Sequence, residues 1–182
     1  TKTGEVIEDI RTLRSEIGIL YLSDFNRKAI LKILKANDLA FHELITCMVY
    51  VYLWKGHPLA GKASICMDDL QDYPCLSFEQ GSDSSFYFAE EIFSMNEAAQ
   101  TIKANDRATM LNLMVGLNGY TLCSGIICEE LNGEDYKAIP FEAADPKSSL
   151  MEIGYITRKD QILSEMGKFY IEKIVQYLGA CS

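Results

Sequence analysis

The sequence has little positive charge and no long apolar run. Its 17 Lys and Arg residues stand against 26 Asp and Glu residues, which gives a net charge of -9. This charge has the wrong sign for a surface that neutralises phosphates, so the chain itself is not expected to bind DNA. The most apolar stretch, Leu44 to Trp54, is followed at once by Lys-Gly-His-Pro and is too short to span a membrane. No membrane segment is therefore predicted.

Histidine and paired cysteines are also scarce. The two histidines, His42 and His57, lie in an apolar strand and in a Gly-His-Pro turn, where structural roles are expected. Because no C-x-x-C pair occurs, the ligand spacing of a zinc site is absent and no metal is predicted. The scattered cysteines are expected to be buried, reduced and cytoplasmic: Cys47, Cys66, Cys75, Cys123, Cys128 and Cys181.

Motifs of catalysis are missing as well. The sequence has no G-x-S-x-G elbow, no phosphate-binding glycine loop and no dinucleotide fingerprint. Neither an enzyme nor a bound cofactor is predicted.

What the sequence does contain is an alternation of apolar strands and amphipathic helices. Helices are predicted at 5–14, 27–35, 85–94, 106–117 and 163–178, and strands at 17–21, 39–45, 48–54, 75–78, 100–103, 120–123, 136–140 and 151–157. This alternation is typical of a parallel sheet covered by helices. Asn105 is the expected cap of helix 106–117. The closing helix is expected to pack through Met166, Tyr170, Ile174 and Leu178.

Three segments resemble a known family. Met48 to Lys62, which reads MVYVYLWKGHPLAGK, is followed by Asp69-Leu70 and by a strand that ends at Phe78. This run resembles the strand, the GHPLA turn and the start of the second lobe in the effector-binding domains of LysR-type bacterial transcription regulators. The segments 105–126 and 151–156 look like that family's later helix, its glycine-bearing strand end and its return to the first lobe. The resemblance extends from about Glu5 to the end of the chain.

The resemblance implies an α/β fold of the type 2 periplasmic-binding-protein class, with two lobes of mixed sheets flanked by helices. Two crossover hinge strands are expected near residues 47–52 and 152–156. The first lobe would comprise residues 1–50 and 152–182, and the second lobe 51–151. A complete first lobe would begin with a further unit of roughly 40 residues, the length of a strand-helix-strand crossover. Its absence would leave strand 17–21 without a neighbour, open to pairing with another chain.

Ligands of such sheets bind beyond the carboxyl ends of strands, which selects two loops. The first loop precedes a helix, where free backbone N–H groups favour an anion, although Ser84 has an equally good claim as a simple helix cap. Its candidate residues are Phe78, Gln80, Gly81, Ser82 and Ser84.

The second loop contains Asn105 and Arg107, with Thr121 and Ser124 expected to face them. Arg107 is suited to clamping a carboxylate, but an arginine at a helix start is more often solvated. Cys123 is a weaker candidate for a redox-sensing thiol, because no neighbour in the sequence would lower its pKa.

The resemblance further implies a sensing and oligomerisation domain. It would bind a small metabolite between the two lobes, with an anionic group expected, and would form a homodimer or larger homo-oligomer. DNA would be contacted only through an N-terminal winged helix-turn-helix that this chain lacks. Two alternatives remain at this stage: a solute-binding protein of the same fold, and an oligomerisation module whose cleft is vestigial.

Overall fold

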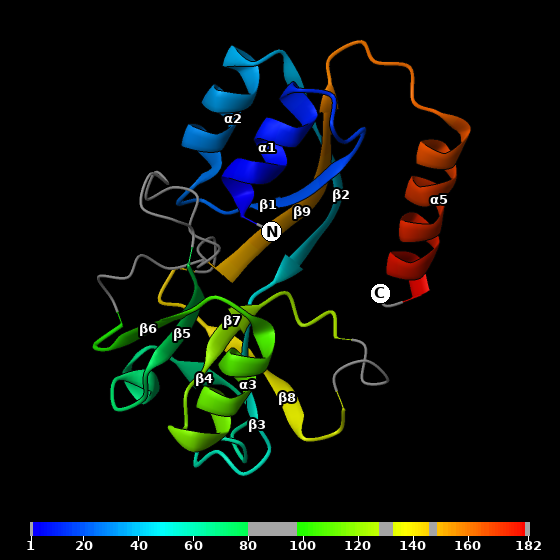
Figure 1. Cartoon of the computed structure of the whole chain (residues 1–182). Helices are drawn as coiled ribbons and strands as arrows, with labels where there is room; N and C mark the ends of the chain where they lie inside the picture. The colour runs from blue at the N-terminus through cyan, green and yellow to red at the C-terminus, as the bar shows by residue number, and fades with distance from the viewer. Residues whose placement is uncertain (1, 80–97, 128–132, 146–148, 181–182) are drawn as a thin grey trace. The chain divides into compact units, whose positions relative to one another are not determined.

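The computed structural model describes residues 2–79, 98–127, 133–145 and 149–180. These residues form two compact units (Figure 1). Unit 1 contains the described residues of 1–46 and 152–180, and unit 2 contains those from 47 to 151. Among the described residues, the chain passes between the units after Thr46 and again before Glu152.

Unit 1 is a three-stranded sheet with helices. Its elements in chain order are α1 (Thr3–Arg11), β1 (Gly18–Leu22), α2 (Arg27–Ala36), β2 (Leu39–Met48), β9 (Leu150–Arg158) and α5 (Glu165–Ala180). The sheet order is β1-β9-β2, so the return strand β9 lies in the middle. Figure 1 shows α1 and α2 on the same face of this sheet.

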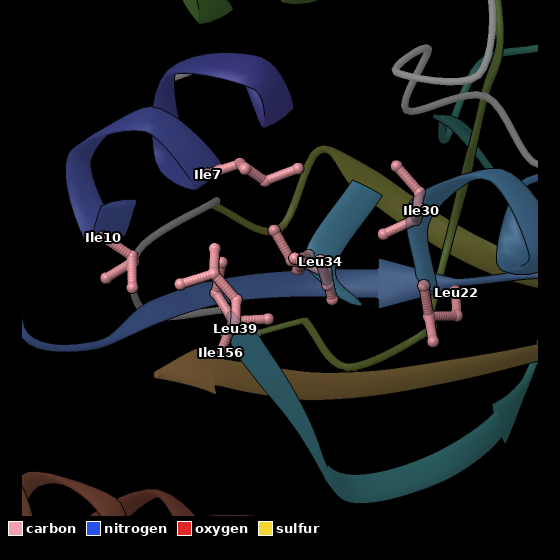
Figure 2. Close-up of a cluster of buried hydrophobic side chains, with 8 residues drawn as sticks. Ile7, Ile10, Leu22, Ile30, Leu34, Leu39 and Ile156 are labelled. Atoms are coloured by element: carbon pink, nitrogen blue, oxygen red, sulfur yellow. The ribbon is translucent and has the colours of Figure 1, made fainter. Parts of the chain in front are cut away.

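The core of unit 1 joins these two helices to the sheet. The amphipathic spacing of both helices turns Ile7, Ile10, Ile30 and Leu34 toward β1 and β9, where Ile156 is fully buried (Figure 2). The remaining members of the cluster are Leu20, Leu22 and Leu39. This packing holds the start of α2 against the end of β1.

The strand predicted at 17–21 has a neighbour, contrary to the expectation above. β1 pairs antiparallel with β9, from Gly18 opposite Ile156 to Leu22 opposite Glu152. The expectation failed because it assumed that the neighbour precedes β1 in the chain. The hydrogen-bonding partner of β1 is instead β9, which lies more than 120 residues later in the chain.

The closing helix packs through only part of its predicted face. Ile174 is half-buried and Leu178 is buried, but Met166 and Tyr170 are exposed, at 74% and 49%, and Gly167 is buried in their place. Two contacts with the segment before β1 set this orientation. Ser164 donates hydrogen bonds from its backbone N–H and its hydroxyl to Glu16, and a Cβ on Gly167 would meet the Glu16 carboxylate at 2.8 Å.

Unit 2 contains two sheets and one described α-helix. Its elements are β3 (Tyr50–Trp54), β4 (Ile65–Cys66), η1 (Asp68–Leu70), β5 (Cys75–Phe78), β6 (Thr101–Ala104), α3 (Arg107–Gly116), β7 (Thr121–Cys123) and β8 (Tyr136–Glu142). The larger sheet has the order β4-β8-β3-β7, and β5 pairs with β6.

The sheets are mixed rather than wholly parallel. β3 runs antiparallel to both β7 and β8, whereas β5 and β6 are parallel. A parallel bridge between Cys75 and Tyr120 connects β5 to the start of β7. The expectation of mixed sheets flanked by helices is thus confirmed. The alternation of strands and helices in the sequence predicted too much parallel pairing, because it does not show which strands run antiparallel to their neighbours.

No helix in the described part of the chain is long and apolar enough to cross a membrane.

His57 stabilises the turn after β3. It is 3% exposed, its Nδ1 accepts a hydrogen bond from the backbone N–H of Leu59 at 3.0 Å, and its Nε2 lies 2.9 Å from the carbonyl oxygen of Asn118. Since Nδ1 accepts, Nε2 carries the proton, and the ring is neutral. Burial lowers the pKa of His57 below its ordinary value of 6.5.

This environment predicts a pH-dependent stability. The unfolded chain binds a proton at His57 before the folded chain does, so the contribution is complete above pH 6.5 and declines as the pH falls below it. His57→Gln should lower the urea midpoint at pH 7.5 and reduce the loss of stability between pH 7.5 and 5.5. An unchanged pH dependence in this variant would show that His57 does not titrate as described.

Candidate functional site

Three strands of unit 2 end at one edge of their sheets. Phe78, the last residue of β5, pairs with Ala104, the last residue of β6, and β7 runs parallel to β5 from its bridge at Tyr120. The carboxyl ends of β5, β6 and β7 therefore meet where α3 begins. This is the position at which open α/β sheets bind ligands.

The cap of α3 is Asp106 rather than Asn105. The Asp106 carboxylate accepts hydrogen bonds from the backbone N–H of Thr109 at 2.8 Å and from its hydroxyl at 2.7 Å. These bonds lower the pKa of Asp106. The prediction chose the earlier of two suitable neighbours, and the extended backbone at Asp106 decides between them.

Removal of this cap tests the assignment. Asp106→Ala should lower the urea midpoint, because it leaves the Thr109 N–H without its carboxylate acceptor. Asn105→Ala is the matched control and should leave the midpoint unchanged. If the two variants lose equal stability, Asp106 is not the cap.

Arg107 lies beside a buried tyrosine. The Tyr52 side chain is 6% exposed and stacks on Tyr136 with ring centroids 5.6 Å apart. Burial raises the pKa of Tyr52, and the nearby positive charge of Arg107 opposes that rise. The Arg107 side chain also acts on the Tyr52 hydroxyl as a hydrogen-bonding neighbour, although this contact falls outside normal hydrogen-bond geometry.

Thr121 joins this group through the ladder between β3 and β7. It lies directly opposite Tyr52, so both side chains project from the same face of the sheet. Ser124 follows β7, and its hydroxyl accepts a hydrogen bond from the backbone N–H of Ile126 at 3.3 Å. The structure thus brings together Arg107, Thr121 and Tyr52. Asn105 is exposed, and the Ser124 hydroxyl bonds within its own turn.

Cys123 is poorly suited to redox sensing. Burial raises its pKa to about 11, and its sulfur lies 3.4 Å from the backbone nitrogen of Gly125. The thiolate is the reactive form, so this environment suppresses reactivity at neutral pH. Among the residues that the structure describes, the cysteines form no disulfide: Cys47, Cys66, Cys75 and Cys123.

Four predicted site residues, Gln80, Gly81, Ser82 and Ser84, lie outside the described residues. Within the described ranges, no cluster of three or more His, Cys, Asp or Glu side chains is arranged to hold a metal ion.

A second strand end, in unit 1, was not selected from the sequence. Between β1 and α2, the carbonyl oxygen of Ser23 accepts hydrogen bonds from the N–H groups of Asn26 and Arg27, and the Ser23 N–H donates to the Asn26 side chain at 2.8 Å. Ser23 is 6% exposed, yet its hydroxyl has no hydrogen-bond partner. The signal was available, because the segment 23–27, polar except for Phe25, follows an apolar strand and precedes an amphipathic helix.

An ion pair fixes the next residue of this turn. Arg27, the first residue of α2, pairs with Glu152 of β9, and the side chains are 43% and 28% exposed. Glu152 lies opposite Leu22, the last residue of β1, so the pair ties α2 to the middle of the sheet. The turn after β1 thus contains a buried hydroxyl without a hydrogen-bond partner, at Ser23, and an arginine paired with Glu152.

Comparisons with known proteins agree with this architecture. The oxidised form of OxyR superposes with a TM-score of 0.64 at 18% identity, covering 98% of this chain and 79% of that chain. The effector-binding domain of QuiR, solved with shikimate, gives a TM-score of 0.61 at 18% identity and coverages of 97% and 78%. HinK, a LysR family regulator from Pseudomonas aeruginosa, gives 0.64 at 16% identity, with all of this chain covering 59% of HinK.

At these identities the structural likeness concerns the fold alone. No curated protein sequence matches the chain. The profile of the LysR substrate binding domain, however, matches residues 2–178. The chain therefore belongs to the LysR substrate-binding domain family of transcription regulators and has its periplasmic-binding-protein-like fold.

Proposed function

We propose that this chain is the effector-sensing part of a LysR-type regulator and binds a small polar metabolite at the strand ends of unit 2. In unit 2, Arg107 and the Tyr52 hydroxyl would donate hydrogen bonds to an anionic group such as a carboxylate, with Phe78 and Thr121 beside them. Gln80, Gly81, Ser82, Ser84, Asn105 and Ser124 remain candidates at the same edge.

The observation that carries this proposal is the meeting of the carboxyl ends of β5, β6 and β7 where α3 begins, with Arg107 beside the buried Tyr52 hydroxyl. Open α/β sheets bind ligands at this position, and a guanidinium is suited to a carboxylate.

Sensing requires that the metabolite distinguish two conformational states. A ligand shifts an equilibrium only by its difference in affinity for the two states. In the whole regulator, which would act in the cytoplasm, the favoured state would change how separate DNA-binding heads meet DNA. The net charge of -9 supports the view that the DNA-binding heads, and not this chain, contact DNA.

Thermal unfolding tests the proposal. The chain should be heated with individual amino acids, diamines, dicarboxylates and hydroxylated carboxylates such as shikimate, each at rising concentration. A true ligand raises the melting temperature in a saturable way, as mass action requires. If no compound does so, the sensing function is rejected, and an oligomerisation module becomes the better account.

Self-association is part of the same proposal. Large apolar side chains are exposed on and just before α5: Ile162, Met166, Phe169, Tyr170, Val175 and Tyr177. An apolar surface of this kind favours burial against protein. Sedimentation should therefore reveal a homodimer or larger assembly at high concentration, and persistent monomers would contradict this part.

A further inference from the structure

Helix α5 has an exposed apolar stripe beside the face through which it packs on unit 1. The packed face contains Gly167, Ile174 and Leu178. A second set of side chains, spaced by three, four and seven residues, shares another side of the helix about a quarter of a turn away. Its four apolar members are 48% to 74% exposed. We call this set the α5 stripe, and its residues are Met166, Phe169, Tyr170, Lys173 and Tyr177.

The α5 stripe carries one charge, close to its middle. Lys173 Nζ lies 5.3 Å from the centroid of the Phe169 ring and donates a hydrogen bond to Gln176 at 3.0 Å. Gln176 in turn donates a hydrogen bond to Glu172, at the edge of the stripe, at 3.0 Å. Within the described part of the chain, no carboxylate lies within ion-pair distance of Lys173. The stripe therefore presents a cation and an adjacent anion that are not paired with each other.

We infer that the α5 stripe packs against the same stripe of a second copy of this chain, with the two helices antiparallel about a two-fold axis near Glu172. Each Lys173 then lies opposite Tyr170 of the other copy and beside its Glu172, so two reciprocal ion pairs form. Met166 of each copy meets Tyr177 of the other in a sulfur–aromatic contact. A two-fold contact uses one self-complementary patch twice, as this stripe allows. The inference rests on the self-association proposed above and specifies its surface and orientation.

The charges decide the orientation of the two helices. A parallel pair in register would place Lys173 of one copy against Lys173 of the other, and like charges in contact are destabilising. The antiparallel pair alternates the charges of two lysines and two glutamates instead. Since α5 has 16 residues and is about 24 Å long, the contact is small, and the dimer should be weak and dependent on concentration.

The test measures sedimentation equilibrium at rising concentration for two charge reversals at exposed positions. Lys173→Glu gives a copy with two adjacent glutamates, and Glu172→Lys gives a copy with two adjacent lysines. Each variant alone should dissociate with a Kd about tenfold above that of the parent chain, because like charges replace the two ion pairs. An equal mixture of the two variants should recover the affinity of the parent, since each copy then faces the opposite charge.

Lys168→Glu is the control, because it makes the same change of charge on the polar side of α5, where Lys168 pairs with Glu165. It should leave the Kd unaltered. If the two reversals dimerise as tightly as the parent, if their mixture does not recover, or if the control is equally weakened, the α5 stripe is not the interface, although self-association through another surface stands. If the parent chain is monomeric at every concentration, the inference and the proposed self-association both fail, and the sensing function is still tested by the thermal shifts.

Discussion

Gly154→Ala is expected to lower the free energy of unfolding by about 3 kcal/mol, near the upper end for an overpacked core. Gly154 lies in β9, the middle strand of unit 1, opposite Leu20. A Cβ there would overlap the carbonyl oxygen of His42 and the ring of Phe41. Because the carbonyl belongs to the backbone of the neighbouring strand β2, it cannot move aside without separating the two strands.

Urea unfolding at pH 7.5 measures this effect. Gly61→Ala is the control, since a Cβ at Gly61 would meet no atom within 4 Å. The control should retain the midpoint of the parent chain. Equal midpoints for the two variants would mean that β9 does not pack against β2 at Gly154, and the central position of β9 would have to be abandoned.

Arg107→Gln is expected to weaken effector binding about tenfold, because a hydrogen bond to a charged group contributes about 1.5–3 kcal/mol and this side chain is partly solvated. The measurement is a calorimetric titration with the compound that gives the largest saturable thermal shift. Unfolding of the unliganded variant should be unchanged, since Arg107 is exposed at the start of α3.

Tyr52→Phe sharpens this prediction. The Tyr52 hydroxyl contacts Arg107 outside normal hydrogen-bond geometry, so its removal should leave the unliganded chain about as stable as before, while binding becomes weaker. If both variants bind the compound as tightly as the parent chain, the strand ends of unit 2 are not the anion-binding part of the site.

Strong periodicity made most elements predictable from the sequence. The strand Cys75–Phe78 has the same bounds in the structure, and α2 extends one residue beyond its predicted end at Lys35. In both, the apolar spacing and the flanking polar residues agree, so local preference and tertiary packing favour the same answer. The resemblance to LysR-type effector domains was equally direct and is confirmed.

The predictions were wrong where contacts between residues far apart in the sequence determine the structure. The neighbour of β1 is β9, which no local pattern could indicate, and the buried face of α5 follows from the contact of Gly167 with Glu16. The choice of Asp106 over Asn105 depends on one backbone conformation. In each case the sequence offered several acceptable solutions, and packing selected one.

The geometry of the candidate site was partly predictable. The rule that ligands bind beyond strand ends selected Phe78, Arg107 and Thr121, which the structure places at one edge of unit 2, and their role in ligand binding stays a prediction. It did not identify Tyr52, which lies within an apolar strand and gains its interest only from an unsatisfied hydroxyl. Ser23 was missed although it follows the same strand-turn-helix pattern.

The most direct test of effector sensing is residue-by-residue mapping of binding by nuclear magnetic resonance. The ¹⁵N-labelled chain would be titrated with the compound that stabilises it most. The account predicts saturable shifts concentrated at the strand ends of unit 2, residues 105–107 and 121–124, with little change along α5. Saturable shifts confined to other surfaces, or none at any concentration that stabilises the chain, would contradict it.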